Sequence, residues 1–179
     1  MKNKPGSIRQ LVLSALCLAL CLILPQLFHV IPNGYVLSPM HIPVLLCGFL
    51  CGWPYALAVG FVAPFLSFAL TQMPPLFPTG VAMAFELAAY GVAVSLLYAR
   101  LPKKVGSIYA SLLLAMLIGR VAWGLVRWLL SGLAGSAFTF SAFMSGAFLT
   151  ALPAIVLHIV LVPLLVLALR RAGFLQAAA

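Results

Sequence analysis

The 179-residue chain is 65% hydrophobic and only 6% charged, and its mean hydropathy is +1.24. Soluble domains are about a quarter charged, and so few charged side chains cannot cover a soluble core. The composition therefore excludes a separate soluble domain and places residues 1–179 in a bilayer as a single integral membrane domain. With about 20 apolar residues needed for each spanning helix, this length allows five or six crossings.

Proline, glycine and basic clusters divide the chain into six apolar segments, because irregular backbone is tolerated only at the interface or inside protein. The second segment is shorter than a perpendicular span requires, so we expect it to share its depth with protein rather than lipid. Residues 132–145, rich in small residues and Phe, are expected to form a loop on or dipping into the outer face. The sequence predicts an all-α membrane protein with six transmembrane helices, at residues 8–30, 39–51, 55–71, 79–100, 107–133 and 146–171.

The basic residues orient these helices. In the six-helix arrangement every flanking basic residue falls on one side, and the loops on the other side carry no charge. Because an excess of Lys and Arg marks cytoplasmic loops, we expect both termini to be cytoplasmic. This interpretation as topology anchors is favoured over nucleic-acid binding. The anchors are Lys2, Lys4, Arg9, Arg100, Lys103, Lys104, Arg170 and Arg171.

Three ionisable residues lie inside apolar segments, where each is by default a candidate for a functional site. Glu86, the single acidic residue, and Arg127 are expected at matching depth on consecutive helices, near the outer face. Arg120 precedes Arg127 by two helical turns, so the two share a face with Trp123. One interpretation is an ion pair that holds two helices together. The second arginine favours the other, a ligand site, since the guanidinium suits carboxylates and phosphates.

Aromatic and loop residues complete the candidate set. His41 begins the second segment at the outer interface, where it either lines a pocket or anchors in the headgroups. Trp123, Tyr90 and His41 would carry the site alone if the charged face were structural. His158 either bonds a carbonyl freed by Pro163 or contacts a ligand.

Metal and enzyme chemistry find little support in the sequence. No histidine has a second metal ligand at useful spacing, and the four cysteines have the helical spacing of packing residues rather than that of a disulfide framework or zinc site. Paired acids, a serine-protease motif and a nucleotide-binding loop are missing from the sequence. We therefore predict no catalytic residues, no cofactor and no metal site. The cysteines are Cys17, Cys21, Cys47 and Cys51.

Ala15 and Ala19 are four residues apart on one face of the first helix, which lets another helix approach closely. Ordinary packing within the chain is the alternative.

Residues 38–68, SPMHIPVLLCGFLCGWPYALAVGFVAPFLSF, resemble the second and third helices of the substrate-binding S-components of energy-coupling factor (ECF) vitamin transporters. TQMPPLFPTG and residues 83–91, MAFELAAYG, extend the resemblance over nearly the whole chain. It implies a six-helix protein of the prokaryotic plasma membrane that binds a small water-soluble vitamin or precursor near the outer face.

The resemblance also implies partners, namely a transmembrane coupling subunit and two ABC ATPases, with Ala15 and Ala19 docking on the coupling subunit. The competing hypothesis is a stand-alone secondary transporter or channel for a small polar or anionic solute. Such carriers usually have inverted repeats and coupling-ion carboxylates, and neither is evident in this sequence.

Overall fold

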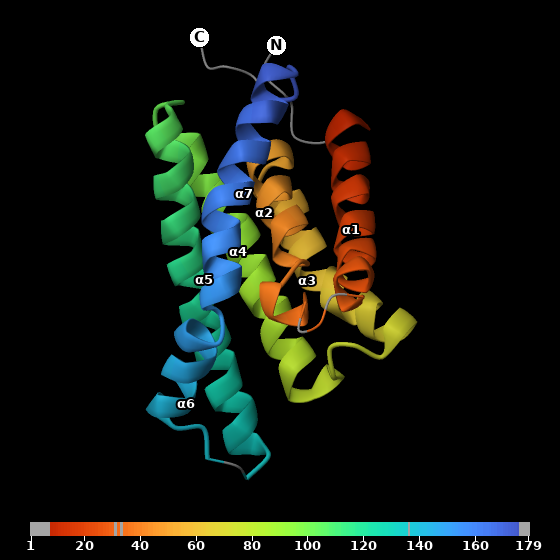
Figure 1. Ribbon diagram of the computed structural model, residues 1–179, viewed down its shortest axis with the longest axis vertical. Coiled ribbons are helices and arrows are strands. Elements are labelled where there is room, and N and C mark those ends of the chain that lie inside the picture. Colours follow the sequence, from red (N-terminus) through yellow and green to blue (C-terminus); the bar gives the residue numbers. More distant parts are fainter. Residues whose placement is uncertain (1–7, 31, 33, 136, 176–179) are drawn as a thin grey trace.

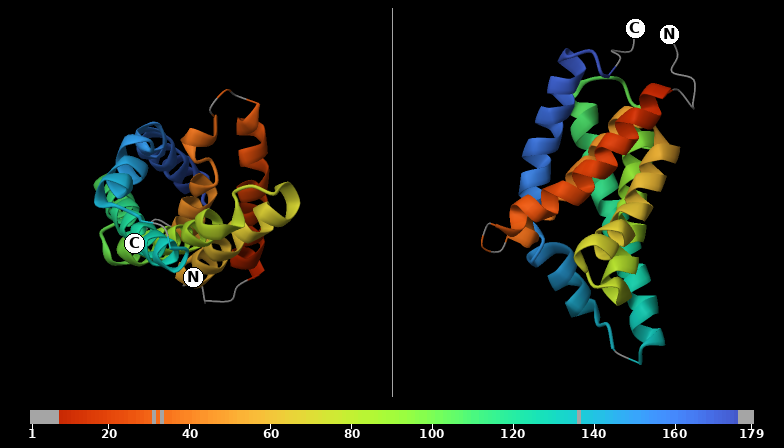
Figure 2. Two further views of the ribbon diagram at one scale, coloured as in Figure 1. Left: turned by 90° about the horizontal axis from the view of Figure 1, so that it is seen from below. Right: turned by 90° about the vertical axis from the view of Figure 1, so that its right-hand side faces the viewer.

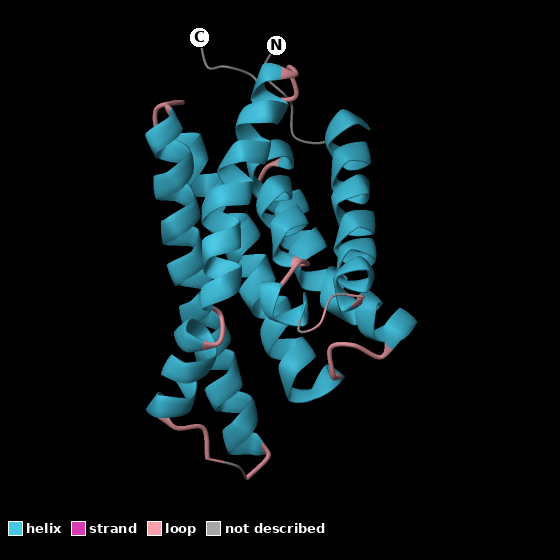
Figure 3. Ribbon diagram, viewed as in Figure 1, coloured by secondary structure: helices cyan, strands magenta, loops and turns pink. Residues whose placement is uncertain are grey.

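The computed structural model describes residues 8–30, 32, 34–135 and 137–175, and within these residues every regular element is helical (Figure 3). The predicted all-α class is therefore confirmed. Short turns of helix, η1 (Gly34–Leu37), η2 (Leu76–Gly80) and η3 (Ser145–Leu149), join the longer elements. Those are α1 (Ile8–His29), α2 (His41–Cys51), α3 (Trp53–Thr71), α4 (Val81–Arg100), α5 (Val105–Leu133), α6 (Phe140–Met144) and α7 (Leu152–Arg171).

Five helical stretches of the described chain are long and apolar enough to cross a membrane: Ile8–Phe28, Trp53–Thr71, Leu76–Arg100, Val105–Leu133 and Leu152–Arg171. The 11 residues of α2 measure only about 17 Å along the helix axis, against a hydrocarbon core of about 30 Å. Every residue of α2 except Leu50 is buried. As its length predicts, α2 lies among other helices, and Figure 1 shows it between α7 and α1.

Glycines bring the backbones of α2, α3 and α4 into close contact. A Cβ atom at Gly60 would lie 2.6 Å from the backbone carbonyl of Leu87, and one at Gly91 would lie 2.9 Å from the carbonyl oxygen of Ala56. A Cβ atom at Gly48 would lie 2.7 Å from the Gly91 carbonyl oxygen. Small residues at such crossings allow tight helix packing without side chains in the way. This packing holds α4, the helix that carries Glu86.

The connection between α5 and α7 differs from the predicted loop. Residues 140–149 are helical, and α7 begins at Leu152 rather than at 146. The Thr139 hydroxyl accepts a hydrogen bond from the Ala142 N–H, 3.3 Å away, and so caps the start of α6. Pro153 lies in the first turn of α7, where proline favours a new helix start. The expectation of a loop through residue 145 is wrong for this stretch, which projects with the end of α5 beyond the other helices (Figure 2).

The start of α1, the end of α7 and the α4–α5 connection lie at one end of the bundle (Figure 2). The Arg9 guanidinium donates hydrogen bonds to the carbonyl oxygens of Gly173 and Phe174 at 3.2 and 3.3 Å. Arg170 donates to the Lys103 carbonyl oxygen at 2.8 Å. We call this the basic end of the molecule. The flanking basic residues that the structure describes thus gather at one end, as their sequence positions predicted, whereas Lys2 and Lys4 lie outside the described residues. The orientation in the membrane stays a prediction.

Candidate functional site

A cavity of about 450 Å³ lies at the end of the bundle opposite the basic end. The C-terminal ends of α1 and α3 and the N-terminal ends of α2 and α4 surround it, and α5 closes one side. Met40, Met83 and Trp123 supply large apolar surfaces. The polar part of the lining consists of Gln26, Ser38, His41, Ser67, Thr71, Thr79, Glu86 and Arg120.

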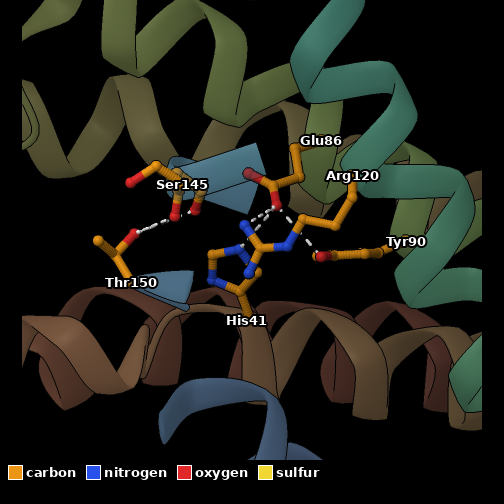
Figure 4. A network of polar contacts seen from close by, with 7 residues as sticks. His41, Glu86, Tyr90, Arg120, Ser145 and Thr150 are labelled. Carbon is orange, nitrogen blue, oxygen red and sulfur yellow. Dashed lines mark hydrogen bonds and ion pairs between the residues drawn. The ribbon is translucent and has the colours of Figure 1, made fainter. Parts of the chain in front are cut away.

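Polar groups from three helices converge on one carboxylate oxygen at the base of this cavity (Figure 4). Oε1 of Glu86 lies 2.9 Å from a terminal guanidinium nitrogen of Arg120 and accepts a hydrogen bond of 3.1 Å from the Tyr90 hydroxyl. Nε2 of His41 is 3.6 Å from the same oxygen. Glu86 is 2% exposed and Arg120 8%. Burial without partners is costly for either charge, so the two compensate each other.

Local sequence explains this geometry. Tyr90 follows Glu86 by one helical turn on α4, so the two side chains share a face. A Cβ atom at Gly119 of α5 would lie 2.3 Å from the Tyr90 ring. Glycine at 119 therefore lets the ring lie against α5, and the next residue, Arg120, reaches Glu86.

Two histidines extend the buried polar group. The rings of His41 and His158 stack with their centroids 5.7 Å apart, and the His41 and Tyr90 rings meet edge to face at 5.4 Å. His158 lies on α7 and His41 at the start of α2, so the stacked rings connect these two helices. Sequence reasoning left His158 between two roles, because nothing in its surroundings on α7 indicates that it lies beside His41.

Several buried nitrogen atoms at the site have no hydrogen-bond partner among the described residues. They are Nδ1 and Nε2 of His41, Nε of Arg120 and Nε2 of His158. An unpaired buried polar atom costs about 1–3 kcal/mol, and such atoms are rare in folded proteins. Of these three residues, His41 and Arg120 line the cavity, and His158 stacks on His41 behind them.

Arg127 does not reach Glu86. Its guanidinium donates a hydrogen bond to the Thr79 hydroxyl at 3.0 Å, and Arg127 itself is not part of the cavity lining. The cavity lining therefore contains one acidic residue, Glu86, and one arginine, Arg120. Of the other candidates, His41 and Trp123 line the cavity, whereas Tyr90 contacts it only through Glu86.

Ala15 and Ala19 are exposed on α1, away from the cavity. This helix is the least buried of the five long apolar stretches, with 17% of its most apolar window buried. Its small-residue face is therefore open to lipid or to a partner.

The chain matches a known family over most of its length. A family model described as "ECF transporter, substrate-specific component" matches residues 9–166. This range contains every residue that lines the cavity. Neither the curated proteins nor the solved structures gave a significant match.

Proposed function

The chain belongs to the family of substrate-specific components of ECF transporters, and from that premise we propose that it captures a small water-soluble vitamin or vitamin precursor. Membership makes it the substrate-binding subunit of a transporter rather than an enzyme, associated with ECF transmembrane and ATPase modules. The observation that supports the finer proposal is the cavity of about 450 Å³, in which His41 and Arg120 have buried nitrogen atoms without hydrogen-bond partners among the described residues. A compartment of this size suits a ligand of vitamin dimensions.

The proposed membrane arrangement has six crossings with both termini cytoplasmic in a prokaryotic plasma membrane. The five long stretches supply five crossings. The short helix α2 is proposed as the sixth, packed among the other helices rather than against lipid. The gathering of Arg9, Lys103 and Arg170 at one end supports a cytoplasmic location for that end. The cavity then opens toward the outside.

Within the cavity, Glu86, Arg120, His41 and Trp123 are proposed to contact the substrate directly. Tyr90 and Arg127 support binding through the residues that they hydrogen-bond, which are Glu86 and Thr79.

The charges in the cavity lining indicate which net charge the substrate carries. Because Glu86 and Arg120 compensate each other, a substrate that is neutral or zwitterionic leaves no net charge buried. A carboxylate ligand would have to compete with Glu86 for Arg120. Arg127 hydrogen-bonds Thr79 and lies outside the cavity lining, so it offers an anionic ligand no unpaired guanidinium there. We therefore favour a neutral or zwitterionic substrate.

Coupling is proposed to use the exposed face of α1. Ala15 and Ala19 leave a shallow surface on which a helix of the transmembrane coupling subunit can lie closely. Two ABC ATPases bound to that subunit would supply the energy for import.

The proposal is tested with the solubilised wild-type chain. Mass spectrometry should identify a copurifying small molecule, and calorimetric titration of that molecule should show that Glu86→Gln weakens binding. Lys104→Gln, at the basic end, is the control and should bind normally. Failure of the wild type to bind any small molecule, together with failure to support import when combined with a coupling module, would show that the chain is not a substrate-capture subunit.

A further inference from the structure

A second hollow, of about 540 Å³, lies between α5 and α7, which run side by side in Figure 1. Apolar side chains of α7 line most of it, including Val160, Leu164 and Ala168. Tyr109 of α5 and Arg171 of α7 lie at its basic end. The groove does not include any residue of the substrate cavity.

At the polar end of this groove, one of the basic residues, Arg171, has no partner within the described part of the chain. Arg170 donates to the Lys103 carbonyl, and Lys103 in turn donates to the Tyr98 carbonyl and lies 3.9 Å from the centre of the Tyr98 ring. Arg171, by contrast, is exposed and forms no hydrogen bond or ion pair with the part of the chain that the structure describes. Its guanidinium is free to bind an anion at the mouth of the groove.

The length of the groove matches half a bilayer. Val160 and Arg171 are three helical turns apart, about 17 Å along α7, and one leaflet contributes about 15 Å of the hydrocarbon core. Val160 and Leu164 are each 60% exposed, so an acyl chain lying in the groove can contact their apolar surfaces. The groove thus has an apolar floor one leaflet long and a cation where that leaflet ends.

We propose that this groove is a binding site for one anionic phospholipid, with an acyl chain along Val160 and Leu164 and the phosphate on Arg171. Charge complementarity supports this occupant, since anionic headgroups are attracted to Lys and Arg at the membrane surface. The net charge of +9 adds to that attraction. The proposal is independent of which substrate occupies the cavity.

The test is native mass spectrometry of the full chain in detergent, with phosphatidylglycerol and phosphatidylcholine of identical acyl chains. The wild type should retain phosphatidylglycerol in preference to phosphatidylcholine. Arg171→Gln should reduce that preference about fivefold, the value expected for one cation near a membrane surface. Ala168→Trp should fill the groove and reduce retention of both lipids. Arg100→Gln and Ala99→Trp, exposed positions at the same end on α4, are the matched controls and should behave as the wild type.

Equal retention of the two lipids by the wild type would overturn the proposal, as would an equal loss of preference in Arg100→Gln and Arg171→Gln. If Ala168→Trp does not fold, Arg171→Gln still decides the result, because its side chain is exposed. Normal lipid retention by Ala168→Trp, combined with failure to assemble with the coupling subunit, would identify the groove as a protein contact and also overturn the proposal.

Discussion

Glu86 of α4 and Arg120 of α5 form a buried ion pair, with 2.9 Å between the carboxylate oxygen and the guanidinium nitrogen, and both residues line the cavity. From the sequence alone, a helix-pairing salt bridge and a ligand site are alternative interpretations of these charged residues. The structure shows the ion pair between the two helices, and both of its side chains also line the cavity, so the ligand site stays a proposal that is compatible with the pair. Substitutions at these positions should therefore affect stability and binding to different degrees.

Arg120→Ala should destabilise the protein by about 3–5 kcal/mol, because it leaves the Glu86 carboxylate buried without its cation. Glu86→Gln combined with Arg120→Met removes both charges and should be closer to the wild type than Arg120→Ala alone. Thermal unfolding in detergent measures the difference. A wild-type unfolding temperature for Arg120→Ala would mean that water or another group compensates Glu86.

His41→Phe should weaken substrate binding and leave the fold intact. The phenyl ring keeps the stacking against His158, which has 5.7 Å between centroids, while the two ring nitrogens that lack partners are removed. Loss of one hydrogen bond of about 1.5 kcal/mol corresponds to roughly tenfold in affinity. Calorimetric titration with the copurifying molecule gives the value, and Tyr98→Phe at the basic end is the control. Unchanged affinity in His41→Phe would remove His41 from the site.

Arg127→Gln should reduce the affinity for the substrate less than Arg120→Ala does. Its guanidinium acts through the Thr79 hydroxyl, so Thr79→Val should weaken binding to a similar degree. The double variant should be no worse than either single one, because both changes remove the same interaction. Additive losses in affinity would instead show that Arg127 contacts the substrate by itself.

Much of the fold follows from the sequence, since hydropathy and Pro/Gly breaks predict the helices and the short length of α2 predicts its burial. Which arginine pairs with Glu86 could not be predicted from the sequence. Counting residues from the helix ends places Arg127 at the same depth, but the crossing of α4 and α5 depends on close packing at Gly119 against Tyr90. Depth along a helix is readable from sequence, whereas rotation and crossing angle depend on tertiary packing.

The stacking of His41 on His158 could not be predicted from the sequence for the same reason. His41 and His158 lie far apart in the sequence, on α2 and α7, and their stacking requires these two helices to be neighbours in the bundle. Helical periodicity carries information about one helix at a time. The capping of α6 by Thr139 was readable in principle, because Thr before a helical stretch is a known start signal.

Ala15→Trp and Ala19→Trp should reduce transport while leaving substrate affinity unchanged, because both side chains are exposed and neither lines the cavity. A bulky ring on this face prevents close approach of another helix. Uptake into vesicles containing the complete transporter and calorimetric titration of the isolated chain separate the two effects. Val156→Trp, at an exposed position on α7, serves as the control. Normal transport by both alanine variants would place the coupling surface elsewhere.

The orientation can be tested with single cysteines, because the four native cysteines are buried and should react little with a membrane-impermeant maleimide. The wild type is therefore the blank. Ala142→Cys on α6 is exposed near the cavity end and should label from outside intact cells. Gly106→Cys, where an added Cβ atom meets nothing within 4 Å, is at the basic end and should label only after the membrane is opened. If both label from outside, α5 does not separate the two faces and the six-crossing arrangement fails. If only Gly106→Cys labels from outside, the protein is inverted and the cavity faces the cytoplasm, which would contradict capture of an external substrate.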